Sequence, residues 1–160
     1  MQTELRKNYI GLDENQAAGL ATELNQLLAD YHVFYQNLRA FHWNIKGENF
    51  FTLHEKFEEL YNNAKENIDE VAERVLTLGY VPIHRLENIL KESNISEAET
   101  VGESKEIVKT LLDNFSTLLV QERKILKLAG EADDEASVDL MTGYISAQEK
   151  VCWMLSAFLK

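Results

Sequence analysis

The chain has 160 residues and a mass of 18.4 kDa, which suits one domain with a hydrophobic core and is too short for two ordinary domains. Hydrophobic residues make up 45% and charged residues 27%, and no apolar run approaches the roughly 20 residues of a membrane span, so the composition indicates a soluble globular protein. The formal net charge of −11 repels phosphate and attracts cations, which makes metal ions better candidate partners than nucleic acid.

The sequence predicts an all-α protein, because it contains a single proline and no strand-type alternation of apolar and polar residues. Apolar residues in steps of three and four predict a long first helix over 13–41, with Asp13 as its N-cap. After a short break, Thr52 and Glu55 have the spacing of a capping box, which predicts a second long helix that ends near 79–82.

A third and a fourth long helix follow after a long connection. Residues 83–102 are too many for a tight turn, and the apolar positions within 86–90 predict a short helix there. The third long helix is expected to end near Gly130, and the fourth to begin with Asp133 and Asp134. Four long helices with one long crossover predict a ferritin-like four-helix bundle with a short extra helix in the crossover.

We expect residues 1–160 to form a single domain, with 1–12 as a short N-terminal extension. The first residues lack the apolar stretch of a secretory signal, and the single cysteine, Cys152, has no partner for an internal disulfide. Both features favour the cytoplasm. Cys152 falls late in the fourth helix, where we expect it to act as a small apolar residue.

The candidates for chemistry are four histidines and the acidic residues, because Gly-rich phosphate loops, G-x-S-x-G elbows and paired cysteines are missing. No histidine is preceded by glutamate at the third position before it, so the Glu-x-x-His signature of an internal di-iron site is absent. His32 and His84 have no carboxylate at ligand spacing and are expected to be structural. His42 and His54 remain as candidate ligands.

A stripe of His54, Glu58, Asp69 and Glu73 runs along the second helix, beside its apolar face. His54 and Glu73 are 19 residues apart, roughly 28 Å along the axis, so one chain cannot bring them to one metal ion. Two such helices packed antiparallel across a two-fold axis place the first pair of one chain against the second pair of the other. His42, at the end of the first helix, can reach the same place.

The predicted site contains two imidazoles and three carboxylates, a set that suits Fe(II), with Zn, Mn or Co as competitors. A different interpretation stays open, because acids four residues apart are common on solvated helix faces. Lys65 shares part of the same arc and can equally form an ion pair at an interface. The neighbouring aromatic residues are expected first of all in the core and at interfaces.

A longer motif surrounds these candidates. It reads His42-Trp43-Asn44-Ile45-x-Gly47-x-x-Phe50-x-x-Leu53-His54-x-x-Phe57-x-x-x-Tyr61 and continues with Asp69-x-x-Ala72-Glu73-Arg74. The motif closely resembles the signature of the Dps family (DNA-binding protein from starved cells), which are ferritin-like mini-ferritins. The likeness extends over the whole chain, including the short helix after Pro82 and Trp153 near the end.

The resemblance implies a shell of twelve subunits with a ferroxidase centre between two-fold-related chains. Carried over by position, the ligands are His42, His54 and Glu58 from one subunit and Asp69 and Glu73 from the other. Glu58 departs from the family, where this position is more often Asp. The implied function is iron storage and detoxification: oxidation of Fe(II) by hydrogen peroxide or O2, deposition of ferric mineral in the shell, and protection against oxidative damage.

The resemblance also suggests roles for three further residues. Trp43 resembles a tryptophan that traps radicals beside the centre, although packing accounts for it equally well. Asp134 and Asp139 resemble acids that line a channel for entering cations, whereas stabilisation of a helix N-terminus is the alternative.

DNA binding is not expected to carry over with the family name. Arg6 and Lys7 are the only basic residues before the first helix, so the Lys/Arg-rich tail of DNA-coating members is missing. Compaction of DNA as a nucleoid-associated protein is kept as the alternative function. A purely structural role as a helical oligomer is the third possibility.

Overall fold

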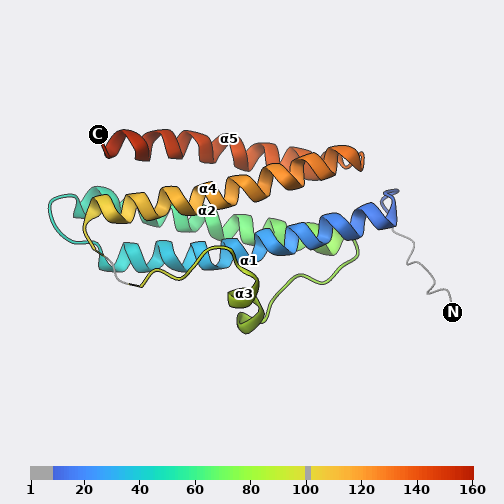
Figure 1. The fold of residues 1–160 in the computed structure, drawn as a ribbon, viewed down its shortest axis with the longest axis horizontal. Coiled ribbons are helices and arrows are strands. Elements are labelled where there is room, and N and C mark those ends of the chain that lie inside the picture. The colour runs from blue at the N-terminus through green and yellow to red at the C-terminus, as the bar shows by residue number, and fades with distance from the viewer. Residues whose placement is uncertain (1–8, 100–101) are drawn as a thin grey trace.

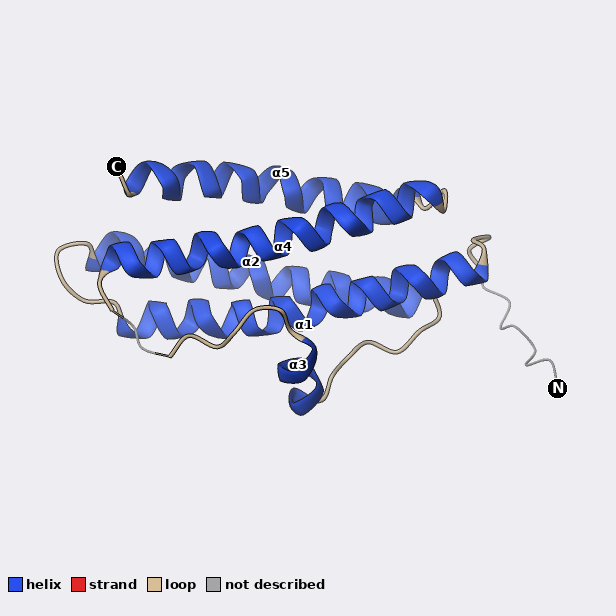
Figure 2. Cartoon of the chain, in the orientation of Figure 1, coloured by secondary structure: helices blue, strands red, loops and turns tan. Residues whose placement is uncertain are grey.

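The computed structural model describes residues 9–99 and 102–160, and within these ranges the chain forms five helices and no strands. The helices are α1 (Glu14–Asn44), α2 (Phe50–Thr77), α3 (Leu86–Glu92), α4 (Ser104–Glu131) and α5 (Glu135–Phe158). The four long helices run side by side, and the short α3 lies outside them next to α1 (Figure 1). Every regular element is helical (Figure 2), so the all-α bundle with a helix in its crossover is confirmed.

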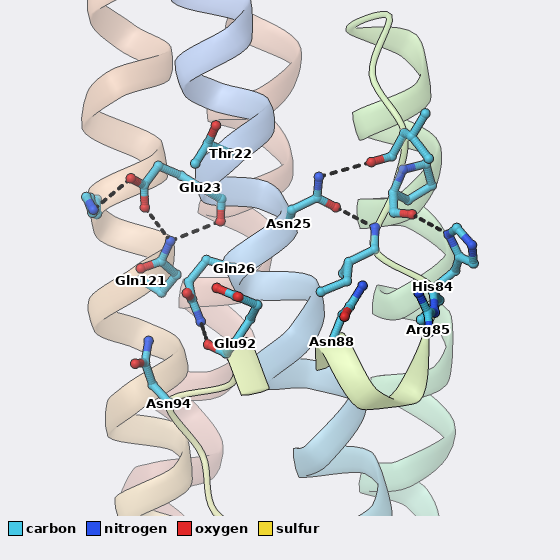
Figure 3. Close-up of a pocket in the computed structure, with 14 residues that line it drawn as sticks. Thr22, Glu23, Asn25, Gln26, His84, Arg85, Asn88, Glu92, Asn94 and Gln121 are labelled. Carbon is cyan, nitrogen blue, oxygen red and sulfur yellow. Dashed lines mark hydrogen bonds and ion pairs between the residues drawn. The ribbon is translucent and has the colours of Figure 1, made fainter. Parts of the chain in front are cut away.

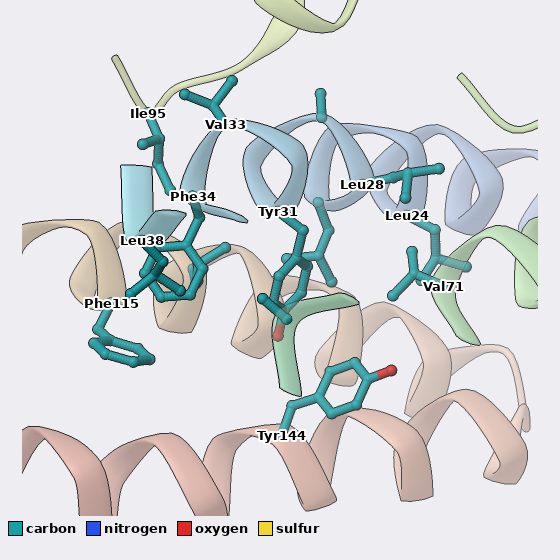
Figure 4. Close-up of a cluster of buried hydrophobic side chains, with 14 of the residues drawn as sticks. Leu24, Leu28, Tyr31, Val33, Phe34, Leu38, Val71, Ile95, Phe115 and Tyr144 are labelled. Atoms are coloured by element: carbon teal, nitrogen blue, oxygen red, sulfur yellow. The ribbon is translucent and has the colours of Figure 1, made fainter. Parts of the chain in front are cut away.

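The bundle forms because each long helix turns its apolar residues inward. Helix α1 packs against α2, α4 and α3, and α4 packs against α5. Leu24, Leu28, Phe34 and Leu38 of α1 are almost fully buried (Figure 4), and the Phe34 ring meets that of Phe115 on α4 with centroids 5.0 Å apart. None of the described helices is long and apolar enough to cross a membrane.

The start of α1 agrees with the sequence prediction, and the start of α2 differs from it. Asp13 caps α1 as predicted, because its carboxylate accepts a hydrogen bond of 2.9 Å from the Gln16 amide. The capping box of Thr52 and Glu55 is wrong, since α2 begins at Phe50. Gly47 has φ = +93°, and the resulting turn lets the Phe50 amide bond the Gly47 carbonyl at 3.1 Å, which starts the helix earlier.

Side chains of α1 hold the long crossover in place. Asn25 donates to the Val81 carbonyl (3.1 Å) and accepts from the Ile83 amide (2.8 Å). Asn94 follows the end of α3, and its backbone amide donates a hydrogen bond of 2.6 Å to buried Asp30 of α1. A polar cavity of about 610 Å³ lies between α1, this crossover and α4 (Figure 3). Its lining includes none of the five predicted metal ligands.

Candidate metal centre

His42 and His54 are joined by two reciprocal hydrogen bonds. The Nδ1 of His42 lies 2.7 Å from the His54 carbonyl, and the Nδ1 of His54 lies 2.8 Å from the His42 carbonyl. A carbonyl oxygen only accepts, so the Nδ1 atom of each ring donates its hydrogen and Nε2 is the nitrogen left for a metal ion. The rings stack at 3.7 Å with an angle of 17° between them. The hydrogen bonds and the stacking therefore fix the orientation of both imidazoles.

Glu58 completes a group of three candidate metal ligands on this chain. It follows His54 by one helical turn, and one ligand atom from each of His42, His54 and Glu58 lies within 4.8 Å of the others. His42 is 8% exposed, His54 is half-buried and Glu58 is exposed, so the group opens toward the surface. An ion held here keeps free positions on its open side.

Asp69 and Glu73 lie farther along α2 and do not belong to this group. Both side chains are exposed on the surface of the single chain. Asp69 lines a hollow together with Asn62 and Lys65. Three protein ligands are too few for a closed site, so a metal ion at the His42–His54–Glu58 group would need further donors from water or from another molecule.

Aromatic rings hold the two histidines from both sides. Phe50 stacks on His54 with ring centroids 4.9 Å apart, and the edge of Tyr61 meets His42 at 5.3 Å and 87°. The edge contact of Tyr61 with His42 was not predicted from the sequence. The signal was present, because His54, Glu58 and Tyr61 follow the i, i+4, i+7 spacing of one helix face.

Trp43 is 57% exposed although it adjoins buried His42. The Arg39 guanidinium lies 4.7 Å from the centroid of its ring, a cation–π contact. Packing in the core of its own chain therefore does not account for Trp43. The radical-trap role stays a prediction.

The two predicted channel acids differ in their surroundings. Asp134 is 3% exposed, caps α5 through the Ser137 amide (3.1 Å) and pairs with Arg74 (2.6 Å). Burial opposes the charge of Asp134, but the bonds from Ser137 and Arg74 outweigh it and lower the pKa. Asp139 is exposed and shares a shallow groove with Glu70 and Glu73. Of the two acids, only Asp139 offers its carboxylate at the surface of the chain.

His32, His84 and Cys152 lie away from the His42–His54–Glu58 group. His32 and His84 do not join the ligand group of the described residues; burial lowers the pKa of His32, and His84 is exposed. Cys152 is half-buried, and burial raises its pKa, which disfavours the reactive thiolate.

Comparisons with known proteins agree with the architecture. A family model described as "Ferritin-like domain" matches residues 21–160. The chain is 46% identical over 148 residues to a DNA protection during starvation protein of Porphyromonas gingivalis, covering 92% of this chain and 93% of that one.

Two solved structures are also similar. The Dps protein of Vibrio cholerae O1, described as a member of a broad superfamily of ferritin-like diiron-carboxylate proteins, has 49% identity, 99% coverage of both chains and a TM-score of 0.95. A Dps protein of Bacillus brevis has 42% identity and a TM-score of 0.88, with 91% of this chain and 98% of that chain covered.

If His42, His54 and Glu58 bind a metal ion together, a substitution at Glu58 weakens metal binding. Replacing Glu58→Gln removes the only carboxylate of the group, and we expect the affinity for Co(II) to fall at least tenfold in anaerobic titration. Glu55→Gln is the matched control, since Glu55 is exposed on the same helix and outside the group. Equal Co(II) affinity for the Glu58→Gln variant and the wild type contradicts the assignment.

Proposed function

The chain belongs to the Dps family of ferritin-like proteins, and on that basis we propose that it stores iron and oxidises Fe(II) at sites shared between two copies of the chain. The observation that carries this proposal is the preorganised but incomplete group of His42, His54 and Glu58. Iron is the substrate, and two carboxylates from a neighbouring copy complete the site.

The positions of the acids on α2 support a shared site. The pair His54 and Glu73 and the pair Glu58 and Asp69 have the same midpoint, between residues 63 and 64, which is also the middle of α2 (Phe50–Thr77). Two α2 helices that cross antiparallel at this midpoint place Asp69 and Glu73 of the second copy opposite Glu58 and His54 of the first. A single antiparallel alignment of the two α2 helices therefore creates two identical sites and pairs the helices over their full length.

Exposed apolar side chains support assembly of several copies. Phe51 is 83% exposed, Leu86 73% and Trp153 68%, and they lie on three different helices. Large apolar residues at the surface are typical of subunit interfaces when they gather into patches. We propose the twelve-subunit shell of the family, built from two-fold dimers, with the cavity as the place of iron deposition.

The proposed reaction follows from the donor set. Imidazole nitrogens bind Fe(II) well, and carboxylates stabilise Fe(III), so oxidation is favoured once iron is bound. Two Fe(II) ions supply the two electrons that reduce one hydrogen peroxide to two hydroxide ions, and no hydroxyl radical leaves. O2 is the alternative oxidant, and Zn, Mn or Co competes with iron for the site. The Fe(III) then hydrolyses and grows as ferric mineral inside the shell.

Two further residues have proposed roles in this reaction. We assign Trp43 to the capture of stray radicals, because it is exposed and next in sequence to His42. We assign Asp139 to the wall of an entry channel, because it shares a groove with Glu73. Asp134 was predicted with it, and any channel role must coexist with its buried ion pair to Arg74.

The ferroxidase proposal is tested by anaerobic Fe(II) loading followed by hydrogen peroxide. The double variant His42→Ala/His54→Ala loses both nitrogen ligands, and we expect its Fe(II) oxidation to slow at least tenfold. His84→Ala is the control, because His84 is exposed and outside the group. Equal rates of Fe(II) and peroxide consumption in the double variant and the wild type overturn the proposal.

The names of relatives refer to DNA protection, and we propose that this chain protects DNA by removing Fe(II) and peroxide rather than by binding DNA. Twelve chains of net charge −11 total about −132, which repels phosphate. The basic residues Arg6 and Lys7 lie outside the described residues.

A gel-shift with plasmid DNA tests this point. We expect no retardation by the assembled protein at physiological salt, because a strongly negative shell gains nothing by releasing counterions from DNA. Retardation of the plasmid favours the DNA-compacting alternative instead.

A further inference from the structure

Four polar side chains, one from each long helix, meet at the centre of the bundle. They are Tyr31 of α1, Asn67 of α2, Glu122 of α4 and Gln148 of α5. None is more than 5% exposed. Figure 4 shows Tyr31 reaching from α1 into the core, among apolar side chains. A polar group costs free energy in such a place unless its hydrogen bonds are satisfied.

Most of the polar atoms in this cluster have partners. The Tyr31 hydroxyl donates to Oε1 of Glu122 at 2.7 Å and accepts from the side-chain amides of Asn67 (3.1 Å) and Gln148 (2.7 Å). The same Gln148 amide nitrogen also donates to Oε1 of Glu122 at 2.7 Å. All of these donors are directed at Tyr31 or at one oxygen of Glu122.

Two buried acceptors in the cluster have no hydrogen-bond partner, Oε2 of Glu122 and Oε1 of Gln148. They belong to side chains that already touch through their other atoms. A buried carboxylate oxygen and a buried amide oxygen cannot satisfy each other, because both only accept. Each of the two oxygens needs a donor hydrogen or a positive charge to offset its burial.

Among residues 9–99 and 102–160, no cationic side chain pairs with Glu122 inside the bundle. The titratable groups that face it are Tyr31 on α1, and Tyr144 and Cys152 on α5. On the α2 side, Glu70 accepts the Tyr144 hydroxyl at 2.6 Å and adds negative charge. Arg123 follows Glu122 on α4, but it is exposed and pairs with Glu149.

A metal ion fits this cluster poorly. The site offers one carboxylate, whereas Ca²⁺, Mg²⁺ and transition-metal sites use several charged or nitrogen ligands. The amide groups of Asn67 and Gln148 present N–H hydrogens toward the centre, which repel a cation. A single proton on Oε2 of Glu122 removes the charge and supplies the missing donor to the Gln148 oxygen.

We infer that the centre of each bundle is a buried proton-binding site, in which Glu122 is held as the neutral acid and its Oε2–H is shared with the amide oxygen of Gln148. The acid and the amide then form two complementary hydrogen bonds, since Gln148 already donates to Oε1. Burial raises the pKa of Glu122 from 4.5 to about 7, against the lowering effect of Tyr31, Gln148 and Arg123. This inference is independent of the proposed iron chemistry.

Binding of this proton links folding to pH. The folded chain holds the proton up to about pH 7, whereas the unfolded chain releases it near pH 4.5. Between these values the folded state binds more protons, so stability falls as the pH rises. The unfolding equilibrium constant is expected to increase on the order of a hundredfold across this window and to level off above it.

Infrared spectroscopy of the metal-free full-length protein tests the proton directly. We expect the carbonyl band of a neutral carboxylic acid at pH 6, its loss by pH 8.5, and its absence at pH 6 from the Glu122→Gln variant. Glu106→Gln, on the exposed face of the same helix, is the control and keeps the band. The wild-type pH series needs no variant, so it stands even if a substitution impairs folding.

Denaturant unfolding between pH 5 and 8 gives a second readout. Glutamine has nearly the shape of the neutral acid, with one side that donates and one that accepts, and it does not titrate. Glu122→Gln is therefore expected to remove the pH dependence of stability that is assigned to Glu122. A wild type without a Glu122-dependent acid band at pH 6 overturns the inference. A bound cation that metal analysis finds in the wild type and not in Glu122→Gln also overturns it, in favour of a metal site.

Discussion

The two reciprocal hydrogen bonds between His42 and His54 determine what the rest of the structure can do. They join the last turn of α1 to the first turn of α2 across the short break at residues 45–49, and each uses a backbone carbonyl that the other histidine supplies. Because both Nδ1 atoms are engaged, Nε2 is the nitrogen that each ring has left for a metal ion. The same two hydrogen bonds therefore connect the two helices and fix the tautomers of both histidines.

Helix geometry then decides where the other ligands are found. A rise of 1.5 Å per residue separates the two halves of the α2 stripe by far more than a metal–ligand bond, so folding of one chain leaves the ligand group incomplete. The common midpoint of the His54–Glu73 and Glu58–Asp69 pairs makes a two-fold axis the simplest way to complete it. In the proposed shell the acidity of the chain has a use, because repeated negative charge draws cations toward the assembly.

Much of the architecture could be predicted because each long helix carries a mostly apolar face. The grouping of His54 with Glu58 follows from their helical spacing, and His42 joins them across the short break between α1 and α2. The start of α2 could not be predicted, since it depends on the positive φ of Gly47, which helical periodicity does not report. The buried cluster was also missed, because Tyr31 reads as part of the apolar face of α1. Glu122 could have indicated this cluster. It lies between Leu118 and Ile125 at helical spacing, so an acid occupies a position on the apolar face of α4.

The central claim is that each metal site takes ligands from two chains, and co-assembly of two complementary variants tests it most directly. His54→Ala breaks one half-site, and Asp69→Asn with Glu73→Gln breaks the other, so shells made of either variant alone should oxidise little Fe(II). In shells that mix both at random, about one site in four combines two intact halves, and activity should return to about a quarter of the wild-type rate. Mixed shells of proven composition that stay as inactive as their parents contradict a shared site.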